Sequence, residues 1–139
     1  MKVKYRDYII SDEKRLIQID SVYTMLSKTY WGAYRPKEII EKSIAYSICF
    51  GIYKDDTMVG FARCVTDYAT LYYLCDVVVD DEHRGQGLGK ALVKAVTEHE
   101  ELSHLLALLD TNDAHCLYEQ FGFEHSLKTA MRRKRPTLK

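Results

Sequence analysis

The sequence predicts an α/β (α+β) fold, in which a mixed, mostly antiparallel sheet of about six to seven strands is flanked by about four helices. The period of the apolar residues supports this fold, because it changes from helical steps to β-rich runs and back. The length of 139 residues, with 47% hydrophobic and 29% charged residues, fits one globular domain with a hydrophobic core. No repeat or long polar linker divides the chain. We therefore expect a single domain over residues 1–139.

The first third of the chain should contain a strand and two helices. Residues 3–10 form the expected opening strand, and Ser11 and Asp12 are suitable caps for a helix that follows it. Residues 31–35 interrupt the helical pattern, and Pro36 suits the first turn of a second helix. The two helices are predicted by apolar residues at three- and four-residue steps, which are Leu16, Ile19, Val22, Tyr23, Leu26 and Tyr30, and then Ile39, Ile40 and Ile44.

The middle of the chain is β-rich. Residues 47–53 and 58–68 are apolar runs, and the turn-forming segment 54–57 between them predicts a hairpin. Residues 70–80 follow after almost no connection, and their β-branched and aromatic content makes them the strongest predicted strand.

The last third should return to alternating helices and strands. A helical pattern covers residues 88–96, and residues 104–110 are apolar on both faces, as in a strand covered on both sides. Residues 113–120 predict a short helix that ends before Gly122, and residues 123–134 can form two short strands. The expected order is βαα–ββ–βαβ–αββ, with one parallel crossover.

The segment "RGQGLGK", residues 84–90, joins the strongest strand to the helix after it. The first turn of a helix has unpaired N–H groups and a partial positive charge, so a loop with few side chains can bind an anion there. Arg84 and Lys90 add positive charge, and the segment therefore predicts a phosphate site. Its spacing fits neither a nucleoside-triphosphate loop nor a dinucleotide fingerprint. Glycines that serve packing alone are the alternative.

Residues 84–89 resemble the R/Q-x-x-G-x-G/A motif of the GNAT superfamily of acyl-CoA-dependent N-acyltransferases, with Arg84, Gly87 and Gly89 at the motif positions. Residues 108–123 resemble the fifth strand and following helix of that family and end in Y-x-x-F-G-F. The resemblance covers most of the chain. It implies an enzyme that transfers an acetyl group from acetyl-CoA, used as a cosubstrate without a metal, to a primary amine by direct attack in a ternary complex.

The resemblance also implies which residues bind the donor. The backbone from Arg84 through Lys90 would hold the diphosphate of coenzyme A, and the main chain of the preceding strand would hold the pantetheine arm, often at a β-bulge. Asn112 matches a polar position that contacts the cofactor. The implied cofactor-binding residues are Val77, Val78, Val79, Arg84, Gly85, Gln86, Gly87, Leu88, Gly89, Lys90, Asn112 and Tyr118.

Tyr118 matches the tyrosine that many members of the family place beside the sulfur of coenzyme A as general acid. The alternative is a purely packing role, as for Leu117 and Phe121 nearby. Asp76 is the first candidate for the general base, because alternation puts it on one strand face with Leu74 and Val78, where burial would raise a carboxyl pKa. A hydrogen-bonded structural aspartate, with proton removal through water, is the alternative. Weaker candidates are Asp110, Glu119 and Asp67.

The acceptor would bind near the first two helices, as the resemblance implies. Tyr30, Trp31, Tyr34 and Arg35 are the expected substrate-binding residues there, because aromatic rings could clamp an acceptor and Arg35 could hold a carboxylate. A packed corner between helices is the alternative for the same residues. The acceptor itself, a small molecule or a peptide amine, is not encoded in any motif.

Composition argues against other classes. Lys plus Arg and Asp plus Glu both number 20, so no overall field attracts nucleic acid or membranes. The basic cluster 131–136 could contact nucleic acid or the 3′-phosphate of coenzyme A, but a solvated edge is favoured. Neither a signal peptide nor a long apolar span is present, which makes the cytoplasm the default expectation. The four cysteines lack zinc-like spacing, so we expect free thiols and no metal. A non-catalytic acyl-CoA-binding module and a homodimer remain open.

Overall fold

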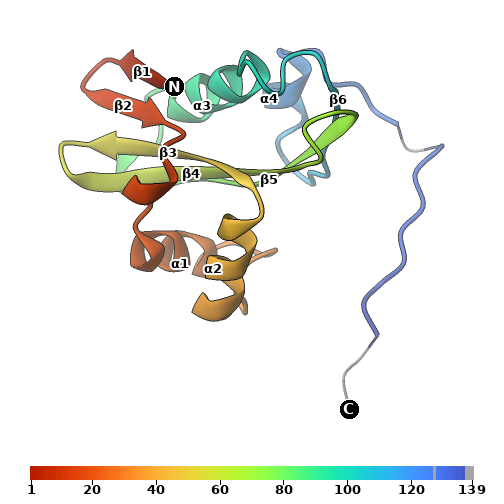
Figure 1. Cartoon of the computed structure of the whole chain (residues 1–139), viewed down its shortest axis with the longest axis horizontal. Helices are drawn as coiled ribbons and strands as arrows, with labels where there is room; N and C mark the ends of the chain where they lie inside the picture. The colour runs from red at the N-terminus through yellow and green to blue at the C-terminus, as the bar shows by residue number, and fades with distance from the viewer. Residues whose placement is uncertain (127, 137–139) are drawn as a thin grey trace.

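The computed structural model describes residues 1–126 and 128–136. Within them, six strands form one sheet in chain order, antiparallel from β1 to β5 and parallel between β5 and β6 (Figure 1). The elements are β1 (Lys2–Tyr5), β2 (Tyr8–Ser11), η1 (Lys14–Leu16), α1 (Ile19–Ser27), α2 (Lys37–Ala45), β3 (Ile48–Lys54), β4 (Thr57–Thr66), β5 (Leu71–Val79), η2 (Asp81–His83), α3 (Leu88–Thr97), β6 (Leu106–Leu108) and α4 (His115–Glu119), where η denotes a short 3₁₀ helix.

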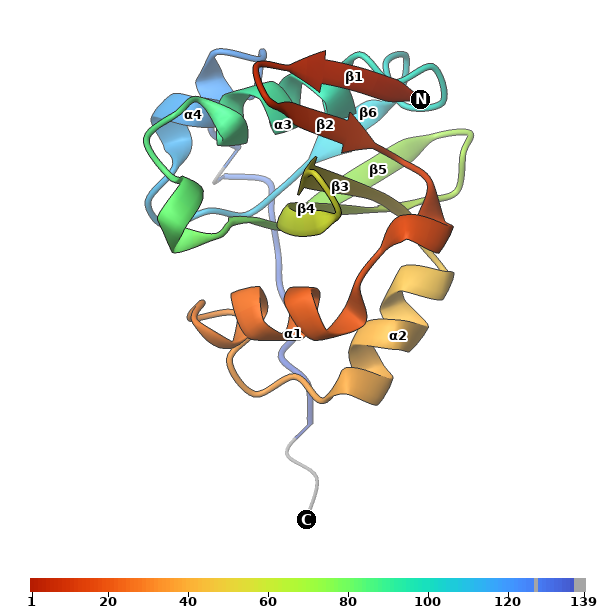
Figure 2. The ribbon, with the colours of Figure 1, turned by 90° about the vertical axis from the view of Figure 1, so that its left-hand side faces the viewer.

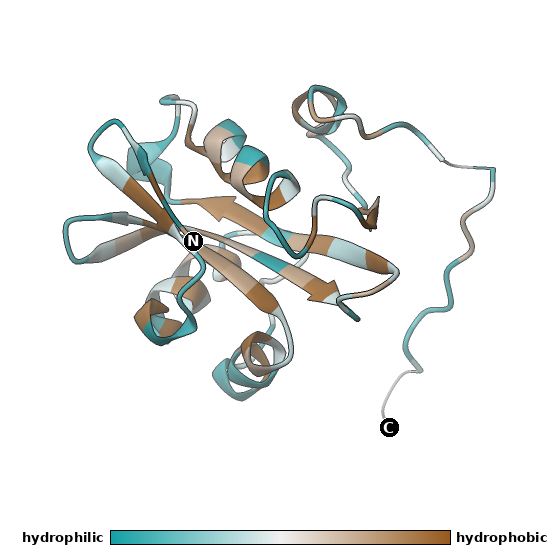
Figure 3. Cartoon of the chain, turned by 45° about the horizontal axis from the view of Figure 1, so that its top comes forward, coloured by the Kyte–Doolittle hydropathy of each residue, from teal (hydrophilic) through white to brown (hydrophobic). Residues whose placement is uncertain are grey.

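Helices cover both faces of the sheet. Figure 2 shows α1 and α2 beneath it, and α3 and α4 above it. Two cores result, one between the sheet and α3, centred on Phe50 and Leu92, and one between the sheet and α1 and α2, centred on Phe61 and Ile40. The apolar strands between helices with polar outer sides are visible in Figure 3. The predicted mixed α/β fold is confirmed.

The start of the chain differs from the prediction in two ways. The opening segment is a hairpin, because Arg6 adopts a φ of 52° and turns β1 back onto β2. Ser11 and Asp12 do not cap α1, which begins only at Ile19. Asp12 instead accepts a 2.8 Å hydrogen bond from Nε2 of His99. A long-range contact thus takes the side chain that local sequence assigns to a helix cap.

The two strands expected over residues 123–134 are absent from the described residues of that segment, and residue 127 lies outside them. The segment ends in consecutive basic residues, and its Met131 is fully exposed, so it has little apolar surface to bury on a sheet. As a consequence β6 has one described neighbour only, and Leu106 and Leu108 are exposed. The expectation that this strand is covered on both sides is therefore wrong.

A β-bulge interrupts β5. Asp76 and Val77 both lie opposite Ala62 of β4, and Asp76 has a φ of 54°. The bulge changes which face the later residues point to, because Leu74 packs in the core beside α3 whereas Val78 packs in the core beside α1 and α2. The prediction that regular alternation puts Asp76, Leu74 and Val78 on one face is therefore wrong.

Candidate active site

A cleft of about 900 Å³ opens where β5 and β6 separate. The two strands pair only as far as Tyr73 and Leu108, and the cleft is lined by the later residues of β5 on one side and by the segment after β6 on the other. The start of α3 and the α1–α2 connection also line it. Most of the predicted site residues meet there, namely Tyr30, Trp31, Arg35, Asp76, Val77, Val78, Val79, Arg84, Gly85, Gly87, Leu88, Gly89, Asn112 and Tyr118.

Three predicted residues do not line the cleft. Tyr34 is almost fully exposed, and Lys90 lies outside the lining. Gln86 supports the loop from behind, because its carbonyl oxygen accepts a 2.8 Å hydrogen bond from the Tyr5 hydroxyl. The Tyr8 hydroxyl also donates to Oε1 of Gln86, at 3.3 Å. The sequence-based interpretation missed this anchoring from the opening hairpin.

The glycines of the loop differ in what requires them. Gly87 caps α3 with a φ of 78°, and a Cβ atom there would lie 2.5 Å from the Tyr5 hydroxyl oxygen. Gly89 has no such conformation, and a Cβ atom there would have nothing within 4 Å. Packing therefore explains Gly87 but not Gly89. Since Gly89 lines the cleft, the lack of a side chain leaves room there for a bound group.

The loop offers a row of free hydrogen-bond donors. In the part of the chain that the structure describes, the backbone N–H groups of residues 85–90 donate to no acceptor. They lie at the beginning of α3, a helix of ten residues whose dipole adds partial positive charge. The Arg84 side chain is held beside them, donating through Nε to the carbonyl oxygen of Val79 at 3.2 Å. This arrangement can bind a diphosphate.

The edge of β5 that faces the cleft is open. Because β6 pairs with residues 71–73 only, the main chain of Val77, Val78 and Val79 has no strand neighbour on that side within residues 1–126 and 128–136. The side chains of Val77 and Val79 pack against the core beside α3. An extended ligand could therefore bind along β5 through main-chain hydrogen bonds.

Tyr118 projects from α4 into the cleft. Its ring is nearly buried, with a relative exposure of 9%, and packs edge-on against Phe123 with ring centroids 5.8 Å apart. Its hydroxyl has no hydrogen-bond partner among the described residues. Burial raises the pKa of Tyr118 to about 12, and the charge of Asp113 and the nearby Tyr30 add to the effect. The hydroxyl is therefore a protonated group that is free to donate.

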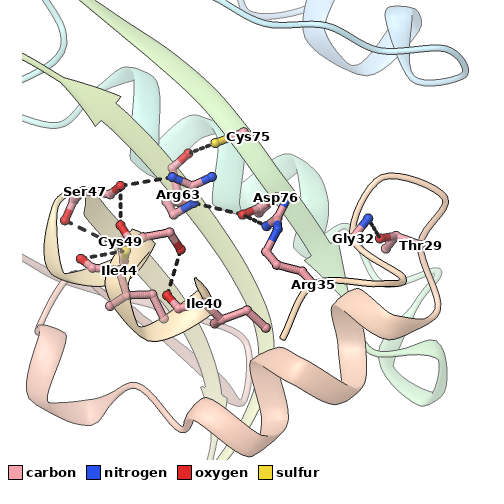
Figure 4. A network of polar contacts seen from close by, with 11 residues as sticks. Thr29, Gly32, Arg35, Ile40, Ile44, Ser47, Cys49, Arg63, Cys75 and Asp76 are labelled. Atoms are coloured by element: carbon pink, nitrogen blue, oxygen red, sulfur yellow. Dashed lines mark hydrogen bonds and ion pairs between the residues drawn. The ribbon is translucent and has the colours of Figure 1, made fainter. Parts of the chain in front are cut away.

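Asp76 is the centre of a charged network (Figure 4). Its Oδ2 atom accepts hydrogen bonds from Nη1 of Arg35 at 2.7 Å and from Nε of Arg63 at 2.9 Å. Arg63 also donates from Nη1 to the Ser47 hydroxyl at 3.2 Å. The sequence-based interpretation missed Arg63, although a lone charge within the apolar strand "FARCV" was a signal that it had a buried partner.

Cys75 also borders the cleft, and its thiol donates to the carbonyl oxygen of Arg63 at 3.4 Å. Burial raises the pKa of Cys75 to about 11. The group is therefore a neutral thiol near pH 7, which is a weak nucleophile.

Aromatic and charged side chains surround the end of the cleft near α1. Tyr30 and Trp31 pack edge to face with centroids 4.9 Å apart, and both remain well exposed. On the opposite rim, Asp110 accepts a 2.6 Å hydrogen bond from the Tyr73 hydroxyl and pairs with Arg132 at 3.1 Å. These last three residues line the cleft. The sequence had offered Asp110 as a weak candidate base and Arg132 only within the basic cluster 131–136, and it had not singled out Tyr73.

Among the described residues, one group of three potential metal ligands lies close together, and it is separate from the network around Asp76. Donor atoms of Asp80, Glu82 and His83 lie within 4.8 Å of one another. Asp80 accepts a hydrogen bond from the backbone N–H of Glu82, and Nδ1 of His83 is 2.9 Å from the Tyr8 hydroxyl. These bonds give the residues a local structural role.

No helix in the described part of the chain is both long and apolar enough to cross a membrane.

Comparisons with known proteins agree with the geometry of the cleft. Residues 45–125 match the family model of the acetyltransferase (GNAT) domain. A solved structure from Xanthomonas campestris pv. campestris, classed with the GNAT acetyltransferases, is 39% identical with a TM-score of 0.89, over 97% of this chain and 98% of that one. A Gibberella zeae protein named as an acetyltransferase is 28% identical, over 85% of this chain and 80% of its own length. A GNAT family acetyltransferase from Elizabethkingia anophelis with acetyl-CoA bound shares the fold, at 16% identity and a TM-score of 0.68, over 88% of this chain and 79% of that one.

Proposed function

Because the chain belongs to the GNAT acetyltransferase family and is an acyltransferase, we propose that it transfers an acetyl group from acetyl-CoA to a primary amine of a small molecule or peptide. The amine attacks directly, in a ternary complex. The observation that carries the proposal is the row of N–H groups at residues 85–90, which have no acceptor among the described residues and lie at the end of an open cleft that also contains the Tyr118 hydroxyl.

In this proposal, the donor binds through the main chain. The N–H groups of residues 85–90 and the Arg84 guanidinium hold the diphosphate, for which the bare Gly89 leaves room. The open edge at Val77, Val78 and Val79 holds the pantetheine arm, and Asn112 contacts it from the other side of the cleft. The acyl end of the donor is thereby directed along β5 toward the bulge at Asp76.

Acyl transfer requires a donor of hydrogen bonds to the carbonyl oxygen and a proton for the leaving sulfur. We assign the first task to the main chain near Val77 and the second to the Tyr118 hydroxyl. A pKa of about 12 keeps Tyr118 protonated throughout the neutral range, as a general acid must be. The neutral Cys75 thiol supports direct attack by the amine over an acyl-cysteine intermediate.

The acceptor amine must lose a proton before it attacks, because an aliphatic amine is mostly protonated at pH 7. Asp76 was one candidate for this base, but its Oδ2 already accepts from two guanidinium groups. We therefore propose that Asp76 positions Arg35 and Arg63, and that the amine loses its proton to water in the cleft. Tyr30 and Trp31 contact the acceptor from the α1 side.

Two measurements on the purified protein test the proposal. Acetyl-CoA at a hundredfold excess over its Kd should stabilise the fold by about 2.7 kcal/mol and raise Tm accordingly. Release of free coenzyme A thiol should then depend on added amine. No rise in Tm at millimolar acetyl-CoA would exclude the proposed donor. A rise in Tm without amine-dependent thiol across a broad panel would leave the alternative, a non-catalytic acyl-CoA-binding module.

A further inference from the structure

The acceptor end of the cleft contains more positive charge than its own residues neutralise. Two guanidinium groups, those of Arg35 and Arg63, share the single carboxylate of Asp76, and both donate to the same oxygen atom. Among the described residues, no second carboxylate forms an ion pair with either arginine. The network therefore carries one uncompensated positive charge.

This charge lies where solvent reaches poorly. The exposed fractions of the side chains are 18% for Arg35, 14% for Arg63 and 2% for Asp76. An excess charge in such a position is costly unless an anion accompanies it. Exposed surface arginines would need no such partner, so the burial is what makes the imbalance informative.

Both arginines keep donors for another group. A guanidinium has five N–H donors, and within the described chain Arg35 uses one of its nitrogen atoms while Arg63 uses two, on Asp76 and the Ser47 hydroxyl. Both side chains also line the cleft. The planar fork of a guanidinium matches a carboxylate.

We infer that the acceptor is an amine that carries a carboxylate, which Arg35 and Arg63 bind beside Asp76. The inference rests on the proposed function, since it concerns the acceptor of that reaction. The bulge that presents Asp76 is also where β5 would hold the acyl end of the donor, so a carboxylate bound there places a nearby amine at the reacting carbon. Tyr30 and Trp31 flank the same end and contact the body of the acceptor.

The test uses matched pairs of amines that differ by the carboxylate alone: phenylalanine and phenethylamine, ornithine and putrescine, serine and ethanolamine. Phosphoethanolamine serves as a separate arm for a phosphate. We expect kcat/KM to be at least about tenfold higher for the carboxylated member of whichever pair is acetylated, as for a hydrogen bond to a charged group. Equal or faster turnover of the decarboxylated members, turnover of phosphoethanolamine alone, or turnover of no compound would overturn the inference.

Substitutions of Arg35 distinguish binding of the acceptor carboxylate from structural support of the β5 bulge. Arg35→Gln should lower the kcat/KM ratio of the carboxylated amine to its decarboxylated partner about tenfold. Arg35→Lys, which keeps the charge and loses the fork, should give an intermediate ratio. Arg15→Gln, an exposed arginine paired with Glu13 away from the cleft, is the matched control. Equal losses for both members of a pair in Arg35→Gln would mean that Arg35 only braces the bulge, and the inference would fail.

The Tm shift with acetyl-CoA is measured on every variant and reports on the proposed function separately. A preserved shift without carboxylate preference removes the acceptor inference alone. A missing shift in the unmodified protein removes the proposed function and this inference with it.

Discussion

Gly89 allows the donor site to be perturbed without damage to the fold. It occupies the second position of α3, has no positive φ, and has open space where a Cβ atom would be. Three replacements form a series: alanine adds one methyl group, glutamine adds a long neutral side chain, and glutamate adds the same length with a negative charge. Each should be compatible with the helix.

The fold should become more stable in all three variants. Replacing glycine within a helix gains roughly 0.5–1 kcal/mol, since glycine loses the most backbone freedom on folding. A carboxylate in the first turn of α3 adds about 0.3–1 kcal/mol through the helix dipole. At about 3–5 °C per kcal/mol for a domain of this size, the Gly89→Glu variant should have the highest Tm in the absence of ligand.

The affinity for acetyl-CoA should follow the opposite order. Alanine should be tolerated, because the GNAT motif that this loop resembles accepts Gly or Ala at this position. Glutamine reduces the free space. Glutamate adds a negative charge beside the proposed diphosphate, and for an assumed separation of about 5 Å the repulsion costs about 1–3 kcal/mol at an effective dielectric constant between those of water and the protein surface. The Kd for acetyl-CoA should thus rise roughly 5- to 150-fold.

The assay combines unfolding curves without ligand and a titration with acetyl-CoA by thermal shift, for the parent and the three variants. Because stability and affinity change in opposite directions, misfolding cannot imitate the expected result. Salt should partly restore binding to Gly89→Glu, since screening weakens the repulsion. A Gly89→Glu variant that is more stable and binds acetyl-CoA as tightly as the parent would refute the location of the diphosphate on this loop.

Three further outcomes follow from the same geometry. Tyr118→Phe should lower kcat at least about 100-fold with little change in the Kd for acetyl-CoA, and an unchanged kcat would remove the acid role of Tyr118. Because the raised pKa keeps the phenol protonated, kcat of the parent should show no alkaline loss from this group up to about pH 10. Gly87→Ala should lower stability by about 1–3 kcal/mol, since it strains a φ of 78° and crowds the Tyr5 hydroxyl, and Tyr5→Phe should recover only the crowding part in denaturant unfolding. Asp76→Asn should lower the free energy of unfolding by up to about 3–5 kcal/mol, because it removes the buried carboxylate that two half-buried guanidinium groups share. Loss of kcat at every pH in a folded Asp76→Asn variant would instead restore Asp76 as the base.

The donor half of the site was predictable because its features are local. An anion site made of glycines, a helix start and Arg84 is contained in seven consecutive residues, and the strand before it is continuous in sequence. The α4 segment with Tyr118 was found through a second short motif. The opening hairpin was not predicted, because its turn contains Arg6 at a positive φ and has no glycine or asparagine, the residues that usually indicate such a turn. The prediction of two strands over residues 123–134 was wrong for another reason. The β-forming residues of this segment are too few to offset four consecutive basic side chains.

The acceptor half was less predictable because it depends on residues far apart in sequence. Arg35 and Arg63 lie 41 and 13 residues from Asp76. The sequence offered Arg35 as an acceptor-binding residue, but nothing local in it indicated that Arg35 and Arg63 meet at Asp76. Their meeting requires the bulge in β5, and a bulge changes the face of a side chain without changing the apolar composition of its strand. Counting alternate residues therefore placed Asp76 in an apolar environment that it does not have.

The bulge also connects the two halves of the site physically. One extra residue in β5 directs the Asp76 carboxylate to the arginines on the α1–α2 side, while Val77 and Val79 after it pack on the α3 side with their main chain open to the cleft. A regular strand could not place Leu74 before the bulge and Val77 and Val79 after it on the same α3 side, since residues an odd number of positions apart point to opposite faces. The ordering of the donor along β5 and the charge presented to the acceptor should consequently respond together to any change that removes the bulge, even though the residues that bind the two substrates belong to different helices and strands.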